Sequence, residues 1–199
     1  MNEKQKNFKS VYDLLYAKDP EPEHAEHVTR LALQLFDALA PLHQLTSEER
    51  DLLKAASLLH DIGWLKGGKK HHKTSMKMIL EKPLPPWSQA EQLMIANIAR
   101  YHRKALPRAG HDHYDNLDSG QQKVVQALAA ILRLADGLDR SHAQIIRSIN
   151  CQIDYDKVVI HLFVSGNSAS EQYGFGKKRD LFQQVFALPI EIGHIEGSS

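Results

Sequence analysis

The chain has 199 residues, of which 42% are hydrophobic and 25% charged, and its formal net charge is +1. This length can bury a hydrophobic core, and so balanced a charge gives no global attraction to nucleic acid or to a membrane surface. The single cysteine, Cys151, excludes an internal disulfide and a thiolate zinc cluster. The sequence shows no signal-peptide pattern and no apolar run of membrane length, so we expect a cytoplasmic protein.

The first half of the sequence predicts helices. Pro22 interrupts a first apolar segment, and proline is tolerated at a helix start, so a second helix is expected over about residues 21–39. Thr46 and Glu49 have the spacing of a capping box and predict the start of a third helix. Gly63 is expected to end that helix.

The next segments alternate between helices and loops. The basic, glycine-containing run 66–73 predicts a loop, followed by a short helix over 75–80. Ser88 and Glu91 form a second capping-box pattern, which opens a helix that reaches about residue 103. Residues 105–120 are polar and predict a long loop, a feature that is often functional inside a compact domain.

The character of the sequence changes near residue 149. Before it, residues 121–148 predict a long apolar helix or a pair of helices. After it we expect a segment of two strands over 150–164, with a hairpin turn at 154–157 and the clearest strand ending at Val164. A loop at 166–176, a helix over 177–186 and a strand over 189–195 should follow. The prediction is a mainly α protein, with a helical domain over 1–149 and a small β-β-α-β appendage over 150–199.

The dipeptide His60-Asp61 is the strongest candidate for chemistry. Histidine is the commonest metal ligand, and the chain has 12 histidines. Adjacent helical residues point about 100° apart, so both side chains reach one ion only at the rim of a helix end. The alternative is a polar helix end with no ligand.

Two further candidates lie on apolar helical faces. His24 leads the stripe that continues through Val28 and Leu31, so its imidazole is either a satisfied core histidine or a ligand. Asp136 lies on the apolar face of the most hydrophobic predicted helix, and a buried carboxylate is costly unless it is paired or bound to a cation. An ion pair is the alternative for Asp136, and Asp139 is the competing carboxylate.

A second ion is the next hypothesis. Asp61 could bridge two ions, with His71 and His102 as ligands of the second one. The alternative is that His71 is exposed in a basic loop. Histidine and carboxylate ligands without thiolate suit Mn, Fe, Co, Ni, Zn or Mg, so the cofactor is expected to be one or two divalent ions from this set.

Basic residues lie near these candidates in the sequence. Lysine and arginine bind phosphate oxygens, although most basic runs are solvated faces. We expect Arg103 and Lys66 to act on a phosphoryl group, because they are closest to His102 and to His60-Asp61. The full set is Lys66, Lys69, Lys70, Lys73, Arg100, Arg103, Lys104 and Arg140.

The order His24, His60-Asp61, Asp136 resembles the HD superfamily of metal-dependent phosphohydrolases. The segments EPEHAEHVTRLALQLFDAL, LLKAASLLHDIGW, HHKTSMKMI, IARYHRKALP and LAAILRLADGLDRSH resemble the C-terminal HD domain of the exopolyphosphatase/guanosine pentaphosphatase (Ppx/GppA) family, and KKRDLFQQVFALPIEI resembles the end of that family. The resemblance implies an HD-domain helical bundle with these four residues as principal ligands. His71 and His102 match further ligands of the histidine-richer HD phosphodiesterases.

The resemblance also has departures. HD phosphodiesterases often carry lysine directly after the glycine, where this sequence has Trp64, and Lys66 is the candidate to replace that lysine. The actin-like domain in which the long family members hydrolyse phosphoanhydrides has no counterpart here. In those proteins the HD region resembles a substrate-binding and dimerisation module, which leaves a homodimer open for this chain.

Two functional hypotheses follow from these residues. The first is metal-dependent hydrolysis of a phosphate ester or phosphoanhydride in a nucleotide or polyphosphate, with Asp61 orienting or deprotonating the attacking water. The second is a non-catalytic module that binds a polyanion such as polyphosphate or an alarmone. A structural helical domain with incidental histidines is the third alternative.

Overall fold

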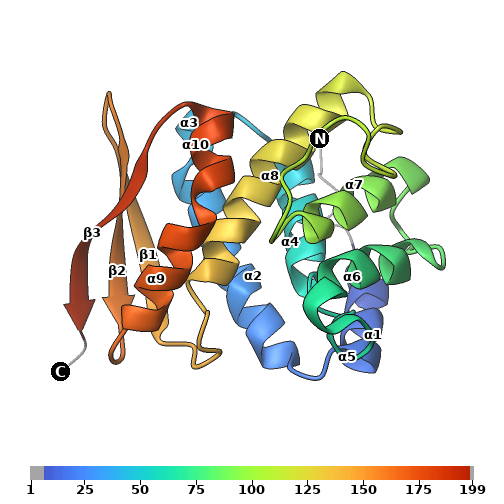
Figure 1. Cartoon of the computed structure of the whole chain (residues 1–199), viewed down its shortest axis with the longest axis horizontal. Helices are drawn as coiled ribbons and strands as arrows, with labels where there is room; N and C mark the ends of the chain where they lie inside the picture. The colour runs from blue at the N-terminus through green and yellow to red at the C-terminus, as the bar shows by residue number, and fades with distance from the viewer. Residues whose placement is uncertain (1–6, 198–199) are drawn as a thin grey trace.

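The computed structural model describes residues 7–197, and helices form most of this part of the chain. A small sheet follows the long helix α8, so the predicted mainly α architecture with a C-terminal sheet is confirmed (Figure 1). The helices before the sheet are α1 (Lys9–Lys18), α2 (Pro22–Ala38), α3 (Ala40–His43), α4 (Ser47–Leu59), α5 (Trp64–Gly67), the 3₁₀ helix η1 (Gly68–Lys70), α6 (His71–Leu80), α7 (Gln89–Arg100) and α8 (Ser119–Gly137). The later elements are β1 (Ile146–Ile153), β2 (Val158–Val164), α9 (Ala169–Lys178), α10 (Asp180–Phe186) and β3 (Ile190–Gly197).

Helix α2 connects the helical part of the molecule to the sheet. It packs against α4 and α8 on one side and against β1 on the other, and it lies between them in Figure 1. Val28, Leu31 and Leu35 are completely buried, as their helical spacing predicts. This stripe orients α2 so that His24, which lies on the same face, points into the protein.

The helix starts follow the sequence pattern closely. Thr46 with Glu49 and Ser88 with Glu91 both form the predicted capping boxes, in which each side chain bonds to the other residue's backbone N–H. The loop between α7 and α8 was also predicted, and it contains neither helix nor strand. The capping boxes could be predicted from the sequence because each one satisfies backbone N–H groups within a single helical turn.

The sheet combines both strand directions. β1 pairs antiparallel with β2, and β2 pairs parallel with β3, in the order β1-β2-β3. The predicted hairpin turn is present, with the N–H of Asp154 donating to the carbonyl of Lys157 at 2.8 Å. The parallel pairing needs a crossover connection, which α9 and α10 supply.

The structure corrects the long helix predicted over 121–148. Helix α8 ends at Gly137, and β1 begins at Ile146, so residue 149 lies within a strand. Two residues of the intervening turn, His142 and Gln144, have positive φ angles. Gln144 donates its backbone N–H to Asp139 Oδ1 at 2.9 Å, a contact that holds the turn.

Two predicted loops are also wrong in part. Residues 66–73 include the second half of α5, all of η1 and the start of α6, so the predicted short helix begins at His71 rather than at residue 75. Residues 166–176 contain most of α9, which makes the C-terminal order β-β-α-α-β. Local helix propensity in both segments is weakened by glycine, and tertiary contacts decide their structure.

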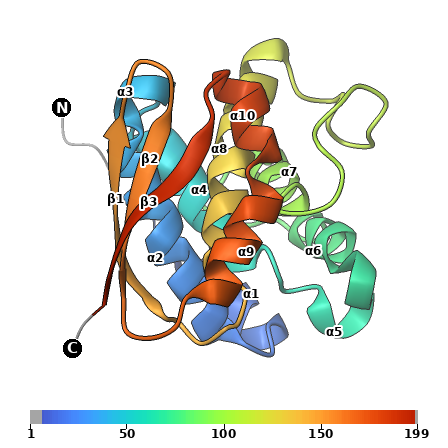
Figure 2. The same cartoon turned by 60° about the vertical axis from the view of Figure 1, so that its left-hand side comes forward.

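Helices α9 and α10 cover α8 on the side away from α4. Both pack directly on α8, and Figure 2 shows them running along it between β3 and the loop that precedes α8. Among the described residues, no helix is both long enough and apolar enough to span a bilayer.

Candidate functional site

The six metal ligands predicted from the sequence lie together in the structure. They form two groups, each with its ligand atoms within 4.8 Å of one another. We call His24, His60 and Asp136 the first ligand group, and Asp61, His71 and His102 the second. The six residues come from α2, the turn after α4, the start of α6, the turn after α7, and α8.

The turn after α4 places His60 and Asp61 side by side. His60 caps α4, and its Nδ1–H donates to the carbonyl of Ser57 at 2.7 Å. Gly63 allows α6 to approach this turn, because a Cβ on it would lie 2.7 Å from the carbonyl oxygen of His71. Its N–H also donates to Ser75 Oγ at 3.0 Å. Glycine at this position therefore brings His71 close to Asp61.

The first ligand group is held by side chains from distant segments. Asp136 Oδ1 lies 3.7 Å from His24 Nε2 and 4.0 Å from His60 Nε2. The Nδ1–H of His24 donates to Asp139 Oδ2 at 2.7 Å, and Asp139 is completely buried. The ring of His142 stacks on that of His24 with centroids 3.8 Å apart. These contacts fix the orientation of the His24 imidazole.

The second ligand group is held by the backbone. His71 Nδ1–H donates to the carbonyl of Gly68 at 2.9 Å, and His102 Nδ1–H donates to that of Ala99 at 2.7 Å. Asp61 Oδ1 lies 3.1 Å from His71 Nε2 and 3.5 Å from His102 Nε2. Asp61 Oδ2 turns toward the other group, 3.8 Å from His60 Nε2. The two oxygens of Asp61 thus face different ligand groups.

The histidine nitrogens at the centre fit a divalent cation. In all four rings Nδ1 donates to an oxygen, so in the neutral imidazole each Nε2 carries a free electron pair. The Nε2 atoms of His24 and His60 are buried without a hydrogen-bond partner. His71 Nε2 and His102 Nε2 lie 3.3 Å apart, with Asp61 Oδ1 beside them. A cation between these electron pairs and carboxylate oxygens would relieve their repulsion.

Burial shapes the charge of these groups. It lowers the pKa of His60 and puts that of His102 well below its ordinary value, which favours the neutral, metal-binding ring. Burial alone would raise the pKa of Asp61, but His60, His71 and His102 together hold it well below its usual range. The site therefore combines neutral imidazoles with an ionised carboxylate.

A pocket of about 420 Å³ opens on both ligand groups. Its lining includes Asp61, His71, His102 and Asp136 from the groups themselves. The remaining charged residues of the lining are all basic: Arg103, Lys104, Arg133, Arg140, Lys177 and Lys178. A pocket with this lining favours an anionic ligand.

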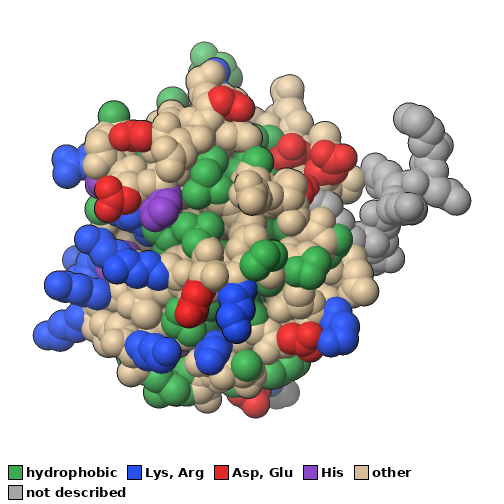
Figure 3. Space-filling model, turned by 90° about the vertical axis from the view of Figure 1, so that its right-hand side faces the viewer, with side chains coloured by type: hydrophobic (Ala, Val, Ile, Leu, Met, Phe, Trp, Pro, Cys, Tyr) green, Lys and Arg blue, Asp and Glu red, His purple; other side chains and the backbone are tan. Residues whose placement is uncertain are grey.

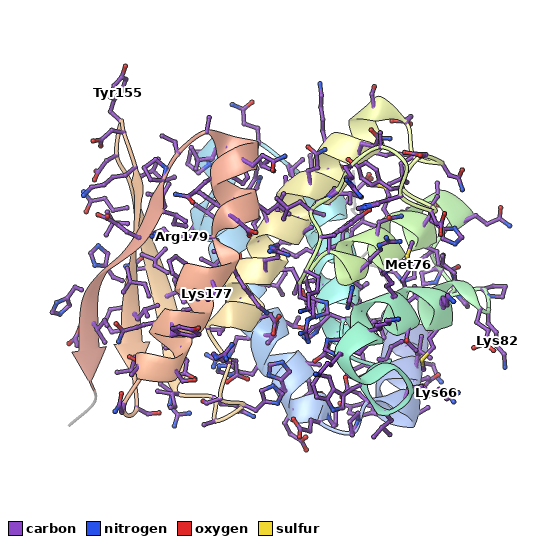
Figure 4. All side chains as sticks on the ribbon, in the orientation of Figure 1. Lys66, Met76, Lys82, Tyr155, Lys177 and Arg179 are labelled. Carbon is purple, nitrogen blue, oxygen red and sulfur yellow. The ribbon has the colours of Figure 1, made fainter. Side chains whose placement is uncertain are left out.

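The two cations predicted to act on phosphate lie in different places. Arg103 lines the pocket, and its guanidinium donates to His71 Nε2 at 3.1 Å. Lys66 is exposed on α5 and is not part of the lining. Figure 4 shows Lys66 at the edge of the molecule, well apart from Lys177 on α9. Figure 3 shows lysine and arginine side chains gathered along one edge of the face it presents. The four lysines of the run 66–73 are exposed, whereas His71 is buried.

The sequence reasoning missed Lys178, which donates from α9 to Asp136 Oδ2. Burial lowers the pKa of Lys178 to about 7. The sequence analysis also treated Asp139 as an alternative ligand to Asp136, whereas Asp139 accepts a hydrogen bond from His24. The signal for Lys178 was the Lys177-Lys178 pair in a segment expected to begin a helix. Nothing in the spacing indicated that this segment would contact a residue 42 positions earlier.

Comparison with known proteins shows which family the chain resembles. The model of the family described as Ppx/GppA phosphatase, domain III, matches residues 10–173. One similar protein is the guanosine-5'-triphosphate,3'-diphosphate pyrophosphatase of Pseudoalteromonas translucida (strain TAC 125), with 32% identity over 84 residues. The match covers 42% of this chain and 16% of that protein, so the chain spans only a small part of its relative's length.

Proposed function

Because the chain belongs to the Ppx/GppA phosphatase domain III family, we propose that it is an HD-type, divalent-metal-dependent phosphohydrolase. Its substrate would be a phosphate ester or phosphoanhydride of the nucleotide or polyphosphate class. The name of the Pseudoalteromonas protein, a guanosine-5'-triphosphate,3'-diphosphate pyrophosphatase, supports this class. The helical part of the chain would then be an HD-domain bundle.

The observation that carries the proposal is the convergence of six ligand atoms beside a basic pocket. His24, His60 and Asp136 would hold one ion, and Asp61, His71 and His102 a second. Histidine and carboxylate ligands accept Mn, Fe, Co, Ni, Zn or Mg. When bound, such an ion polarises a phosphoryl oxygen and lowers the pKa of a water molecule.

The chain's own residues would complete the reaction. Asp61 faces both ligand groups, so its carboxylate is placed to orient the attacking water or to accept its proton. Arg103 would neutralise the charge that develops on the phosphoryl oxygens. Lys66 remains a prediction from the sequence, since its side chain is exposed and lies outside the pocket lining.

Metal analysis and turnover test this function together. The purified full chain should retain about one or two equivalents of transition metal and should cleave bis-p-nitrophenyl phosphate or p-nitrophenyl phosphate. Chelation should abolish the cleavage, and added Mn²⁺ should restore it. Nucleotides, dinucleotides and polyphosphate would then be screened. A protein that binds no metal after loading and cleaves none of these compounds would contradict the proposal.

A polyanion-binding module is the second candidate. The excess of basic side chains in the pocket lining supports it, because cations alone suffice to bind a phosphate chain. This candidate predicts tight binding of polyphosphate by the metal-free protein, no hydrolysis with or without metal, and no effect of Asp61→Asn on binding. The phosphohydrolase proposal instead predicts hydrolysis by the metal-loaded protein and an effect of Asp61→Asn.

A further inference from the structure

Helix α9 forms one wall of the pocket, although it belongs to the C-terminal part of the chain. Gly174, Lys177 and Lys178 all line the pocket. Figures 1 and 2 both show α9 lying across the end of α8 that carries Asp136. The segment after β2 therefore contributes directly to the site, in addition to its role as a crossover.

The position of α9 is fixed by close backbone packing. A Cβ on Gly137 would lie 2.9 Å from the carbonyl carbon and oxygen of Gly174, so the two helices touch through their glycines. Glu171, which is completely buried, accepts the N–H of Ser141 at 3.1 Å. These contacts tie α9 both to α8 and to the turn that carries Asp139. A side chain from this helix can consequently be aimed with accuracy.

Lys178 is aimed at the first ligand group. Its ammonium group contacts Asp136 Oδ2, and its side chain is 20% exposed. The other oxygen of Asp136, Oδ1, faces the Nε2 atoms of His24 and His60. The Asp136 carboxylate is thus divided, with one oxygen toward the ligand group and the other toward the lysine at the pocket.

Arg103 has the equivalent place at the second ligand group. Its guanidinium contacts His71 Nε2, just as Lys178 contacts Asp136. A cation beside a metal site opposes metal binding by repulsion between like charges. An anion bound against both cations removes that repulsion. Two cations, one at each ligand group, therefore indicate a pocket arranged for an anion that lies between them.

We propose that Lys178 is a phosphate-binding residue that, with Arg103, contacts the oxygens of the phosphoryl group, so that α9 completes the active site. This inference rests on the proposed phosphohydrolase function. Lysine is a common phosphate ligand, and its three N–H donors can contact Asp136 and a phosphate oxygen at the same time. It assigns the C-terminal segment a direct part in substrate binding.

Binding of inorganic phosphate provides a test that does not depend on turnover. Isothermal titration calorimetry would compare the metal-loaded full chain with Lys178→Gln, Lys178→Arg and the control Lys123→Gln, which removes an exposed charge from α8. We expect the dissociation constant for phosphate to rise at least about tenfold in Lys178→Gln, as for loss of a charged hydrogen bond. Lys178→Arg should recover part of this loss, and Lys123→Gln should match the unmodified protein.

The same variants separate substrate binding from a merely structural role. In Lys178→Gln we expect kcat/KM to fall at least about tenfold, while metal content and melting temperature stay near those of the unmodified chain. Unchanged phosphate affinity would overturn the inference, and so would a loss of phosphate binding that simply follows loss of metal. If Lys178→Gln does not fold, Lys178→Arg must still alter phosphate affinity.

Failure of the proposed function would have a different signature. A chain that binds no metal and turns over nothing removes the phosphohydrolase proposal. The role of Lys178 would still be tested by the affinity of the metal-free protein for phosphate, with and without the Lys178→Gln change. Weaker binding in the variant would support the lysine's role, and equal binding would exclude it.

Discussion

The two ligand groups are built in different ways. In the first, His24 is oriented by the buried carboxylate of Asp139, and the cation comes from α9. In the second, His71 and His102 are oriented by backbone carbonyls, and the cation Arg103 directly follows His102 in sequence. The orientation of His24 thus depends on a contact between distant segments, whereas the orientation of His71 and His102 depends on nearby carbonyls at helix ends.

This difference has a consequence for metal affinity. A carboxylate that accepts a ligand histidine's Nδ1–H makes the ring more basic than a carbonyl does. His24 has such a partner, and His71 and His102 do not. We therefore expect the first ligand group to hold its ion more tightly, so that careful chelation removes the second ion first.

The largest effect is expected from a change that touches both groups. Asp61→Asn keeps the size of the side chain but removes the charge that faces both sets of histidines. We expect the loss of turnover to exceed the roughly 10–100-fold that outer-shell changes cost, together with loss of metal from the second group. Elemental analysis and aryl phosphate hydrolysis measure both. Asp61→Asn with full metal content and full activity would remove Asp61 from the mechanism.

A change at Asp139 should separate the two groups. Asp139→Asn leaves a hydrogen-bonding partner for His24 but removes the negative charge. We expect metal affinity of the first group to fall roughly 10–100-fold, with little change at the second, measured by competition with a chromophoric chelator. An equal loss at both groups would show that the two are coupled rather than independently built.

The two predicted phosphate-binding cations should differ strongly. Arg103→Gln removes a guanidinium that lines the pocket and contacts His71. We expect kcat/KM to fall by up to about 10²-fold, the lower end of the cost of removing a charge-stabilising donor. Lys66→Gln is the matched change at an exposed lysine on α5, and we expect less than about a threefold effect. A larger loss in Lys66→Gln would mean that α5 moves toward the pocket.

The smallest effect concerns acid stability outside the ligand groups. Burial lowers the pKa of His27 to about 4 in the folded chain, below the ordinary value of 6.5. Between these values the unfolded chain binds a proton that the folded chain does not, so stability is complete above pH 6.5 and declines as the pH falls toward 4. Each kcal/mol lost lowers the melting temperature by about 2–4 °C.

The acid effect is checked on chelated protein, so that metal release does not contribute. His27→Gln should show a shallower decline of melting temperature between pH 6.5 and 4 than the unmodified chain. Parallel curves for the two proteins would assign the acid sensitivity to the other buried histidines, among which burial also lowers the pKa of His72 to about 4.

Local signals in the sequence determined a large part of this protein. Capping residues such as Thr46 and Ser88 place helix starts, and the apolar stripes of α2 and α8 turn His24 and Asp136 inward. These features depend on contacts within a few turns of one helix. His24 and Asp136 could be named as candidate ligands for that reason, and the structure brings them together with the other four candidates.

Only the tertiary structure decided where the C-terminal segment reaches. The contact of Lys178 with Asp136 joins α9 to the end of α8, where Gly137 and Gly174 approach each other closely. A glycine in a sequence indicates a backbone that can adopt many conformations, but it does not indicate which other segment will pack against it. Pairing between distant residues is set by the packing of whole elements, which helical periodicity does not encode.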